Sequence, residues 1–145
     1  MSAAPRQRHR GFTLLELLVV VSIMALSTAG VTLALRDNGQ TLLEREAARL
    51  AVLLEAGRAQ SRASGVPVRW QADLRGFHFE GLPPNTLPRQ WLDPGTTVRG
   101  PTALLLGPEP LIRPQQVLLT HQAYPDRSLR VATDGLRPFA VEPLP

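Results

Sequence analysis

The side chains that could do chemistry are few and widely separated in this 145-residue chain. Cysteine is absent, which excludes thiolate nucleophiles, disulfides and cysteine metal sites. The histidines His9, His78 and His121 lack the spacing of a metal-binding motif, and neither a phosphate-binding glycine loop nor a serine nucleophile motif occurs. We therefore expect a protein that is not an enzyme and that uses no metal and no cofactor.

Glu16 stands out because of the residues around it. It is the single charged residue between Phe12 and Leu35, and the stretch from Leu17 to Leu35 carries no charge. A carboxylate inside a membrane costs about 2–3 kcal/mol on insertion scales, and less near a helix end. Because such a residue is tolerated when it meets a cation, Glu16 is a candidate contact for a positively charged partner group.

The uncharged stretch after Glu16 is long enough for a membrane helix. At about 1.5 Å per residue it spans roughly 28 Å, close to the hydrocarbon thickness of a bilayer. Arg6, Arg8 and Arg10 precede it without an acidic residue, so the positive-inside rule places the N-terminus in the cytoplasm. The residues predicted to span the membrane are Leu17, Leu18, Val19, Val20, Val21, Ile23, Leu26, Val31, Leu33 and Leu35.

Two simpler interpretations compete with a functional role for Glu16. A secretory signal peptide would have the basic start, and Ser27-Thr28-Ala29 loosely resembles a cleavage site. Its apolar region, however, is usually about 7–15 residues long and carries no acid. A plain membrane anchor fits the length but leaves Glu16 unexplained.

The net charge of +4 first suggests a nucleic-acid partner, but its distribution does not favour one. All 16 basic residues are arginines, and the isoelectric point is about 11.2. Three of the arginines lie in residues 1–11, so without that segment 13 arginines face 12 acids and the side-chain charge is +1. The C-terminal region balances three arginines with three acids, namely Arg127, Arg130, Arg137, Asp126, Asp134 and Glu142.

A second helical stretch follows the apolar one. Leu43, Ala47, Leu50, Leu54 and Gly57 recur at steps of four and three, which is the spacing of one helix face. The charged positions between them are expected to form a solvated face, with Glu44, Arg45, Glu55, Arg58 and Arg62 on it.

The two helical stretches are predicted to form one long helix over about residues 13–64, with a possible kink at residues 36–41. A fresh start is the alternative, because Thr41-Leu42-Leu43-Glu44 has the form of a capping box. Gly65 and Pro67 are expected to end the helix.

The remainder, residues 65–145, is predicted to be a β-rich domain. Alternation places Val66, Val68, Trp70 and Ala72 on one face of a first strand, with Trp70 in the core. His78 is expected to reach solvent, and Trp91 is either a loop anchor or an exposed contact. A proline-rich loop covers 81–114. Further strands are expected at 77–79, 97–99, 104–106, 117–120, 128–132 and 139–141, the last two joined by a turn at Asp134-Gly135.

The junction Arg10-Gly11-Phe12-Thr13-Leu14-Leu15-Glu16 resembles the signal of type IV prepilins and type II secretion pseudopilins. The resemblance implies that a prepilin peptidase cuts between Gly11 and Phe12 and methylates Phe12. It also implies that Glu16, the fifth residue after the cut, pairs with the N-terminal amine of a neighbouring subunit. The implied partners are the peptidase, the inner membrane, the major pseudopilin and other minor pseudopilins.

The same resemblance implies a pilin-like α+β fold, in which a long N-terminal helix packs on a mainly antiparallel sheet. The expected segments are a cleaved basic leader at 1–11, a transmembrane and assembly helix at 12–35, its amphipathic continuation at 36–64 and a periplasmic domain at 65–145. The N-terminus would be cytoplasmic and the domain periplasmic, with the chain entering the pseudopilus on assembly.

Within this family the stretch from Leu50 to Trp70 resembles the minor pseudopilin GspH and the minor pilin FimT. Ser64-Gly65-Val66-Pro67-Val68 opens the first strand in the manner of that group, and Asp134-Gly135-Leu136-Arg137-Pro138-Phe139 matches it more loosely. The expected role is a structural subunit of the pseudopilus tip that supports protein export across the outer membrane. The alternative is a FimT-like minor pilin of a type IV pilus, acting in pilus assembly or DNA uptake.

Overall fold

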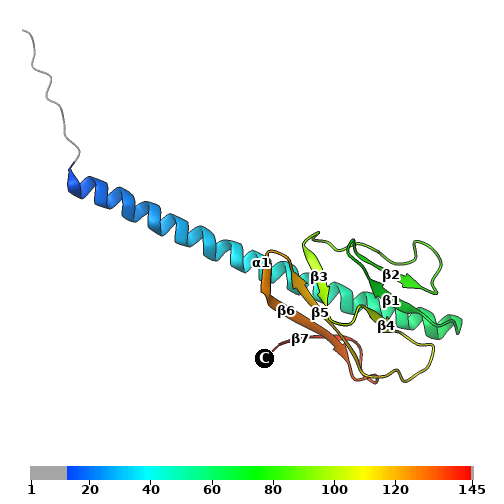
Figure 1. The fold of residues 1–145 in the computed structure, drawn as a ribbon. Helices are drawn as coiled ribbons and strands as arrows, with labels where there is room; N and C mark the ends of the chain where they lie inside the picture. Colours follow the sequence, from blue (N-terminus) through cyan, green and yellow to red (C-terminus); the bar gives the residue numbers. More distant parts are fainter. Residues whose placement is uncertain (1–12, 145) are drawn as a thin grey trace, which may run out of the picture. The chain divides into compact units, whose positions relative to one another are not determined.

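The computed structural model describes residues 13–144, except for the side chains of residues 29, 32–38 and 143. Over this range the chain is α+β, with a long helix and two antiparallel sheets (Figure 1). The elements are α1 (Leu14–Ser64), β1 (Arg69–Ala72), β2 (Phe77–Glu80), β3 (Thr96–Arg99), β4 (Ala103–Leu105), β5 (Gln115–His121), β6 (Tyr124–Thr133) and β7 (Ala140–Pro143). The chain divides into two compact units, with the boundary between Asp37 and Asn38.

The long helix predicted from the sequence is confirmed. The helix is continuous across residues 36–41, so the predicted alternative of a fresh start at Thr41 is wrong. The helix ends as expected, because Gly65 adopts φ 70° and its N–H donates to the Ser61 carbonyl at 2.9 Å. A left-handed residue at this place is the usual helix terminator.

The seven strands form two sheets of different size. One has the order β2-β1-β4 and the other the order β3-β5-β6-β7, and every neighbouring pair is antiparallel. The predicted strands lie at the expected places, and β3 and β4 interrupt the proline-rich loop. The first strand begins at Arg69, later than predicted, and Val66 is 45% exposed rather than on the inner face.

The core lies between the second half of α1 and the two sheets (Figure 1). Leu43, Ala47, Leu50 and Leu54 are buried, which confirms the predicted apolar face. Trp70 is fully buried, also as predicted. The other large members of the core are Val68, Phe77, Phe79, Leu104, Leu106, Val117, Leu119, Leu129, Val131 and Phe139.

Gly100 and Pro101 end the larger sheet before the chain enters the smaller one. The pairing of β3 with β5 ends at Arg99 opposite Leu118, and the next residue, Gly100, adopts φ 84°. Pro101 follows and has no N–H with which to continue a ladder. The chain therefore leaves β5 and pairs with β1 as β4.

At Gly57, α1 packs closely against side chains of the small sheet and the residue that follows it. A Cβ at this position would lie 2.9 Å from Leu106 Cδ1 and 3.1 Å from Phe79 Cε1. Gly57→Leu should therefore destabilise the fold by about 1–3 kcal/mol through overpacking, although leucine is the better helix former. Urea unfolding of the full chain in detergent, followed by tryptophan fluorescence, measures this change.

The control is Gly30→Leu, since a Cβ at Gly30 meets nothing within 4 Å. It has the same gain in helix propensity without the overpacking. Equal unfolding midpoints for the two variants would contradict the close approach at Gly57.

Candidate functional site

Glu16 lies in the first turn of α1. The Glu16 N–H donates to Thr13 Oγ1 at 3.3 Å, and the Leu17 N–H donates to the Thr13 carbonyl at 3.2 Å. Thr13 thus caps the helix, and an acid at this turn is favoured by the helix dipole. Within residues 13–144 the exposed Glu16 carboxylate has no hydrogen-bond or ion-pair partner.

The apolar side chains before and after Glu16 are exposed on all sides of the helix. Those described and exposed are Leu14, Leu15, Leu17, Leu18, Val19, Val20, Val21, Ile23, Met24, Leu26 and Val31. A helix that is apolar all round needs an apolar environment, either lipid or other helices. Gly11 and Phe12 lie outside the described residues, as do the side chains of Leu33 and Leu35.

Three hydroxyls among the described side chains of this apolar stretch are satisfied within the helix. Ser22, Ser27 and Thr28 each donate to the carbonyl four residues earlier, at 2.8 Å. Such bonds remove the need for water at these side chains, as in helices that pack in apolar surroundings.

Among the described residues, no helix is sufficiently long and apolar to cross a membrane.

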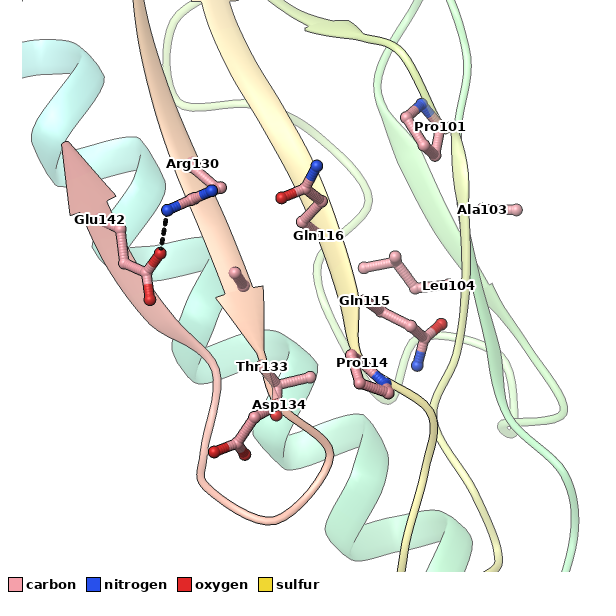
Figure 2. A pocket seen from close by; sticks show the side chains of 11 residues that line it. Pro101, Ala103, Leu104, Pro114, Gln115, Gln116, Arg130, Thr133, Asp134 and Glu142 are labelled. Atoms are coloured by element: carbon pink, nitrogen blue, oxygen red, sulfur yellow. Dashed lines mark ion pairs between the residues drawn. The ribbon is translucent and has the colours of Figure 1, made fainter. Parts of the chain in front are cut away.

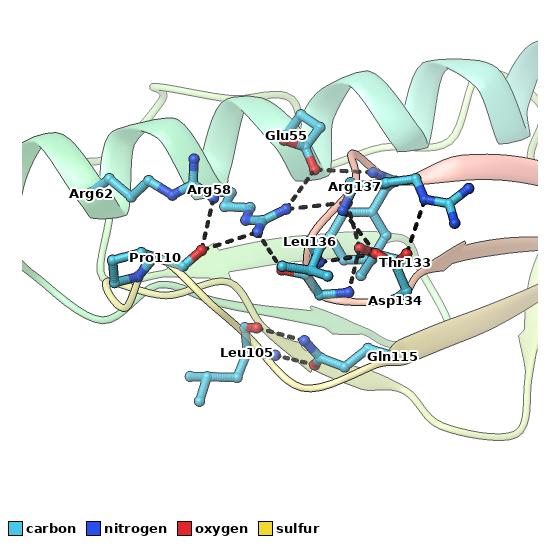
Figure 3. Close-up of polar contacts among 12 residues, drawn as sticks. Glu55, Arg58, Arg62, Leu105, Pro110, Gln115, Thr133, Asp134, Leu136 and Arg137 are labelled. Atoms are coloured by element: carbon cyan, nitrogen blue, oxygen red, sulfur yellow. Dashed lines mark hydrogen bonds and ion pairs between the residues drawn. The ribbon is translucent and has the colours of Figure 1, made fainter.

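The predicted solvated face of the second helical half is wrong at Arg58. Its side chain is 2% exposed, and Nη2 donates to the Gly135 carbonyl at 2.8 Å and to the Pro110 carbonyl at 3.4 Å. Nη1 donates to the Arg137 carbonyl at 3.4 Å (Figure 3). Burial is possible because these carbonyls and Glu55 accept from the two terminal nitrogens Nη1 and Nη2, whereas the buried Nε has no hydrogen-bond partner among the described residues.

Glu55 and Glu46 hold loops by accepting backbone N–H groups. Glu55 Oε1 accepts from the Phe139 N–H at 3.0 Å and lies 3.5 Å from Arg58 (Figure 3). Glu46 is 1% exposed and accepts from the Leu92 N–H at 2.6 Å, while Arg49 pairs with it at 2.9 Å. The helix therefore fastens the turn after β6 and the loop before β3.

The sequence does contain a signal for these buried charges. Glu46 follows Leu43 by three residues and precedes Leu50 by four, and Arg58 follows Leu54 by four. Both therefore lie on the apolar face, where a charge must find partners in loops distant in sequence. The remaining predicted face residues Glu44, Arg45 and Arg62 are exposed, as expected.

Trp91, whose role the sequence left open, and His78, which was predicted to reach solvent, can now be placed. Trp91 is half-buried and its ring centroid lies 4.6 Å from that of Phe77, so it is a loop anchor. His78 is half-exposed between buried Phe77 and Phe79, as predicted. Among the described residues no group of three or more potential metal-binding side chains occurs.

His121 and Asp93 join the loop before β3 to the end of β5. His121 Nε2 lies 3.1 Å from Asp93 Oδ1, and Nδ1 accepts the Ala123 N–H at 3.1 Å. The neutral ring therefore carries its proton on Nε2 and donates it to Asp93. The Gly95 N–H and the His121 side chain together hold the pKa of Asp93 below its usual value.

The C-terminal arginines are engaged within the domain. Arg130 Nη2 lies 2.6 Å from Glu142 Oε2, and Arg137 Nε lies 3.1 Å from Asp134 Oδ2. Arg127 Nη1 donates to Gln40 Oε1 at 3.4 Å. Backbone N–H groups of Arg137 and Leu136 lower the pKa of Asp134, which keeps that carboxylate charged beside Arg137.

The lowered pKa of Asp93 predicts an acid-dependent loss of stability. The stabilisation is fully present above the unfolded pKa of about 3.9 and is lost as the pH falls through the lower folded pKa. Asp93→Asn should therefore be less stable at neutral pH and should show a flatter stability curve below about pH 4. Urea unfolding across this pH range measures it.

The matched control is Asp126→Asn, which removes an exposed carboxylate of the same domain. This variant should keep the acid-side slope of the unmodified chain. If Asp93→Asn keeps the slope as well, the Asp93 contacts do not contribute to stability.

The comparisons with known proteins bear on the N-terminal part of the chain. Residues 6–32 match the prokaryotic N-terminal methylation motif. A search of curated proteins found no match, and neither did a search of solved structures. The matched segment includes Gly11, Phe12 and Glu16, so the chain carries a type IV pilin-like signal. Such a signal supports membership of the pilin family and implies processing by prepilin peptidase and assembly with other pilins.

Proposed function

We propose that the chain is a minor pseudopilin of a type II secretion system, similar to GspH, and a structural subunit of the pseudopilus tip. The observation that carries this proposal is the methylation motif over residues 6–32. The exposed apolar surface of α1 after Glu16 supports it, because that surface suits packing against other helices.

In this proposal the prepilin peptidase removes residues 1–11 and methylates the new N-terminus at Phe12. The apolar helix holds the processed subunit in the inner membrane as a single-pass protein, with residues 65–145 in the periplasm. On assembly the helix exchanges lipid for the helices of the major pseudopilin and the other minor pseudopilins. The work is assembly rather than catalysis.

Glu16 has the properties that such an exchange requires. Its carboxylate lies at the start of the helix, is exposed and has no partner within residues 13–144. In an apolar surrounding an unpaired carboxylate is costly, so a cation from a neighbouring subunit would be favoured there. The amine of a processed N-terminus is such a cation.

A minor pilin of a type IV pilus remains the second candidate, because the methylation motif is shared by both assemblies. Pull-down of the tagged full chain separates them, since it would recover secretion pseudopilins in one case and pilus subunits in the other. A DNA mobility shift with the same chain tests the uptake role, for which the internally paired Arg130 and Arg137 offer little free charge.

Gly11→Val should block leader removal. A side chain at the cleavage site interferes with a peptidase that recognises glycine there, so the variant should keep residues 1–11 attached and should lack N-methylation. Intact-mass spectrometry of the membrane-extracted protein measures both changes. Ala4→Val alters the leader away from the junction and should be processed normally. A mature start at Phe12 in Gly11→Val would disprove the cleavage assignment.

Glu16→Leu should leave the chain membrane-associated and should weaken its association with partner subunits by about tenfold or more, equivalent to at least 1.4 kcal/mol. The reason is the loss of the carboxylate that pairs with a neighbouring amine. Quantitative pull-down of co-expressed pseudopilins measures the association. Ser22→Leu is the control, because it adds a leucine to the same helix and removes only a hydroxyl that bonds internally. Equal recovery for both variants would count against the role of Glu16.

A further inference from the structure

The outer edge of β4 has unpaired backbone groups. The Ala72 N–H donates to the Thr102 carbonyl and the Leu106 N–H donates to the Val68 carbonyl, both at 2.8 Å. The backbone groups of Thr102 and Leu106, on either side of β4, therefore point toward β1. Because backbone groups alternate sides along an antiparallel strand, Ala103 and Leu105 direct their N–H and C=O groups away from β1. Within the described part of the chain, those of Ala103 have no hydrogen-bond partner.

The edge of β5 that lies across from β4 also lacks a neighbouring strand beyond the point where its ladder with β3 ends. Gln122 N–H donates to the Gly95 carbonyl at 2.9 Å, so the even-numbered residues of β5 face β3. The β3 ladder stops at Leu118, where Gly100 and Pro101 turn the partner chain away. The N–H and C=O groups of Gln116 consequently face the space that β3 has left.

At one end of the gap between β4 and β5, a side chain makes the hydrogen bonds that a neighbouring strand would make to β4. Gln115 Oε1 accepts the Leu105 N–H and Gln115 Nε2 donates to the Leu105 carbonyl, both at 2.8 Å (Figure 3). One carboxamide thus satisfies the pair of groups that a neighbouring strand would bind. The edge of β4 is therefore able to pair with a peptide group, and Ala103 offers the next such position.

The gap opens into a pocket of about 580 Å³. Figure 2 shows Ala103 and Pro101 on one side of it and Gln115 and Gln116 on β5 opposite. Its charged side chains are already paired, since Arg130 binds Glu142 and Asp134 binds Arg137. A charged ligand would find no free counter-charge among them, whereas a neutral peptide needs none.

A second, more apolar pocket of about 420 Å³ adjoins the first at Pro114 and Gln115. Leu105 and Leu111 line it and are 48% and 65% exposed. In an extended peptide alternate side chains point to the same face, so a peptide on the β4 edge can place an apolar side chain against these leucines.

We propose that the edge of β4 beside this gap binds an extended, uncharged segment of a partner subunit by β-strand addition. Backbone hydrogen bonds to Ala103, and to Leu105 once the Gln115 carboxamide swings aside, provide the pairing. An apolar side chain of the segment packs against Leu105 and Leu111. This inference rests on the proposed assembly with other pilin-like subunits and assigns the domain surface at which one of them binds.

Hydrogen–deuterium exchange with residue-level fragmentation tests the site on the full chain. The chain is measured alone in detergent and again after co-sedimentation with filaments assembled from its partner subunits. The Ala103 amide should exchange at least tenfold more slowly in the assembled state. The Leu104 amide, which pairs with β1, is the internal control and should be slow in both states.

Different results would contradict the proposed assembly role and the proposed binding edge. If the chain does not co-sediment with filaments, the proposed assembly role is overturned, and this inference with it. If it co-sediments and the Ala103 amide exchanges as fast as in the free chain, the binding edge is wrong while the assembly role stands.

Ala103→Pro provides the matching variant. Proline removes the outward N–H, which has no partner in the isolated domain, and prolines are tolerated at strand edges. The variant should keep the far-UV circular dichroism of the unmodified chain and lose at least tenfold in co-sedimentation, whereas Ala103→Val should retain it. Normal co-sedimentation of Ala103→Pro would overturn the proposal. If proline disrupts the domain, the exchange measurement on the unmodified chain decides.

Discussion

The buried guanidinium of Arg58 connects segments that share no sheet. Its donors meet carbonyls of Pro110, in the loop before β5, and of Gly135, in the turn after β6. A guanidinium cannot lose its proton at ordinary pH, so once buried it must be surrounded by acceptors. Arg58 therefore helps to set the positions of both loops relative to α1. Two neighbours on the same helix contribute: Glu55 accepts the Phe139 N–H, and Arg62 donates to the Pro110 carbonyl.

The two halves of α1 meet opposite chemical demands. The described part of the first half presents apolar side chains outward, and the hydroxyls of Ser22, Ser27 and Thr28 bond within the helix. The second half buries its apolar face under the sheets and turns two of its charges inward to bind loops. A helix divided in this way suits a subunit that is anchored at one end and folded at the other.

Much of the fold could be predicted because it depends on local patterns. Steps of three and four residues gave the buried face of α1, and alternation and turn residues located the strands. Whether the strands form one sheet or two depends on how β3 and β4 pair, and their partners are 19 or more residues away in sequence, so local patterns do not reveal it. The places of Arg58 and Glu46 on the apolar face are a local signal of burial, but their partners are not, since the carbonyl and amide groups that bind them lie 46 or more residues further along.

The features of the candidate site are also of two kinds, those that a local motif reveals and those that depend on tertiary contacts. The N-terminal signal is a contiguous motif, so Gly11, Phe12 and Glu16 can be identified from their order alone. The Asp93–His121 pair and the open edge of β4 arise from tertiary contacts, and neither residue type nor spacing reveals them. The pairing of Arg130 likewise depends on the β6–β7 register, which sets Arg130 opposite Glu142.

The break at Gly100 and Pro101 has a thermodynamic consequence. Residues 96–105 form one extended run whose first part belongs to the larger sheet and whose last part belongs to the smaller one. If residues that favour strands stood at the break, the ladder could continue toward Gln116 and the two sheets could merge. The domain thus lacks hydrogen bonds that a continuous ladder would make, and the described strands leave an open edge of β4 beside the break.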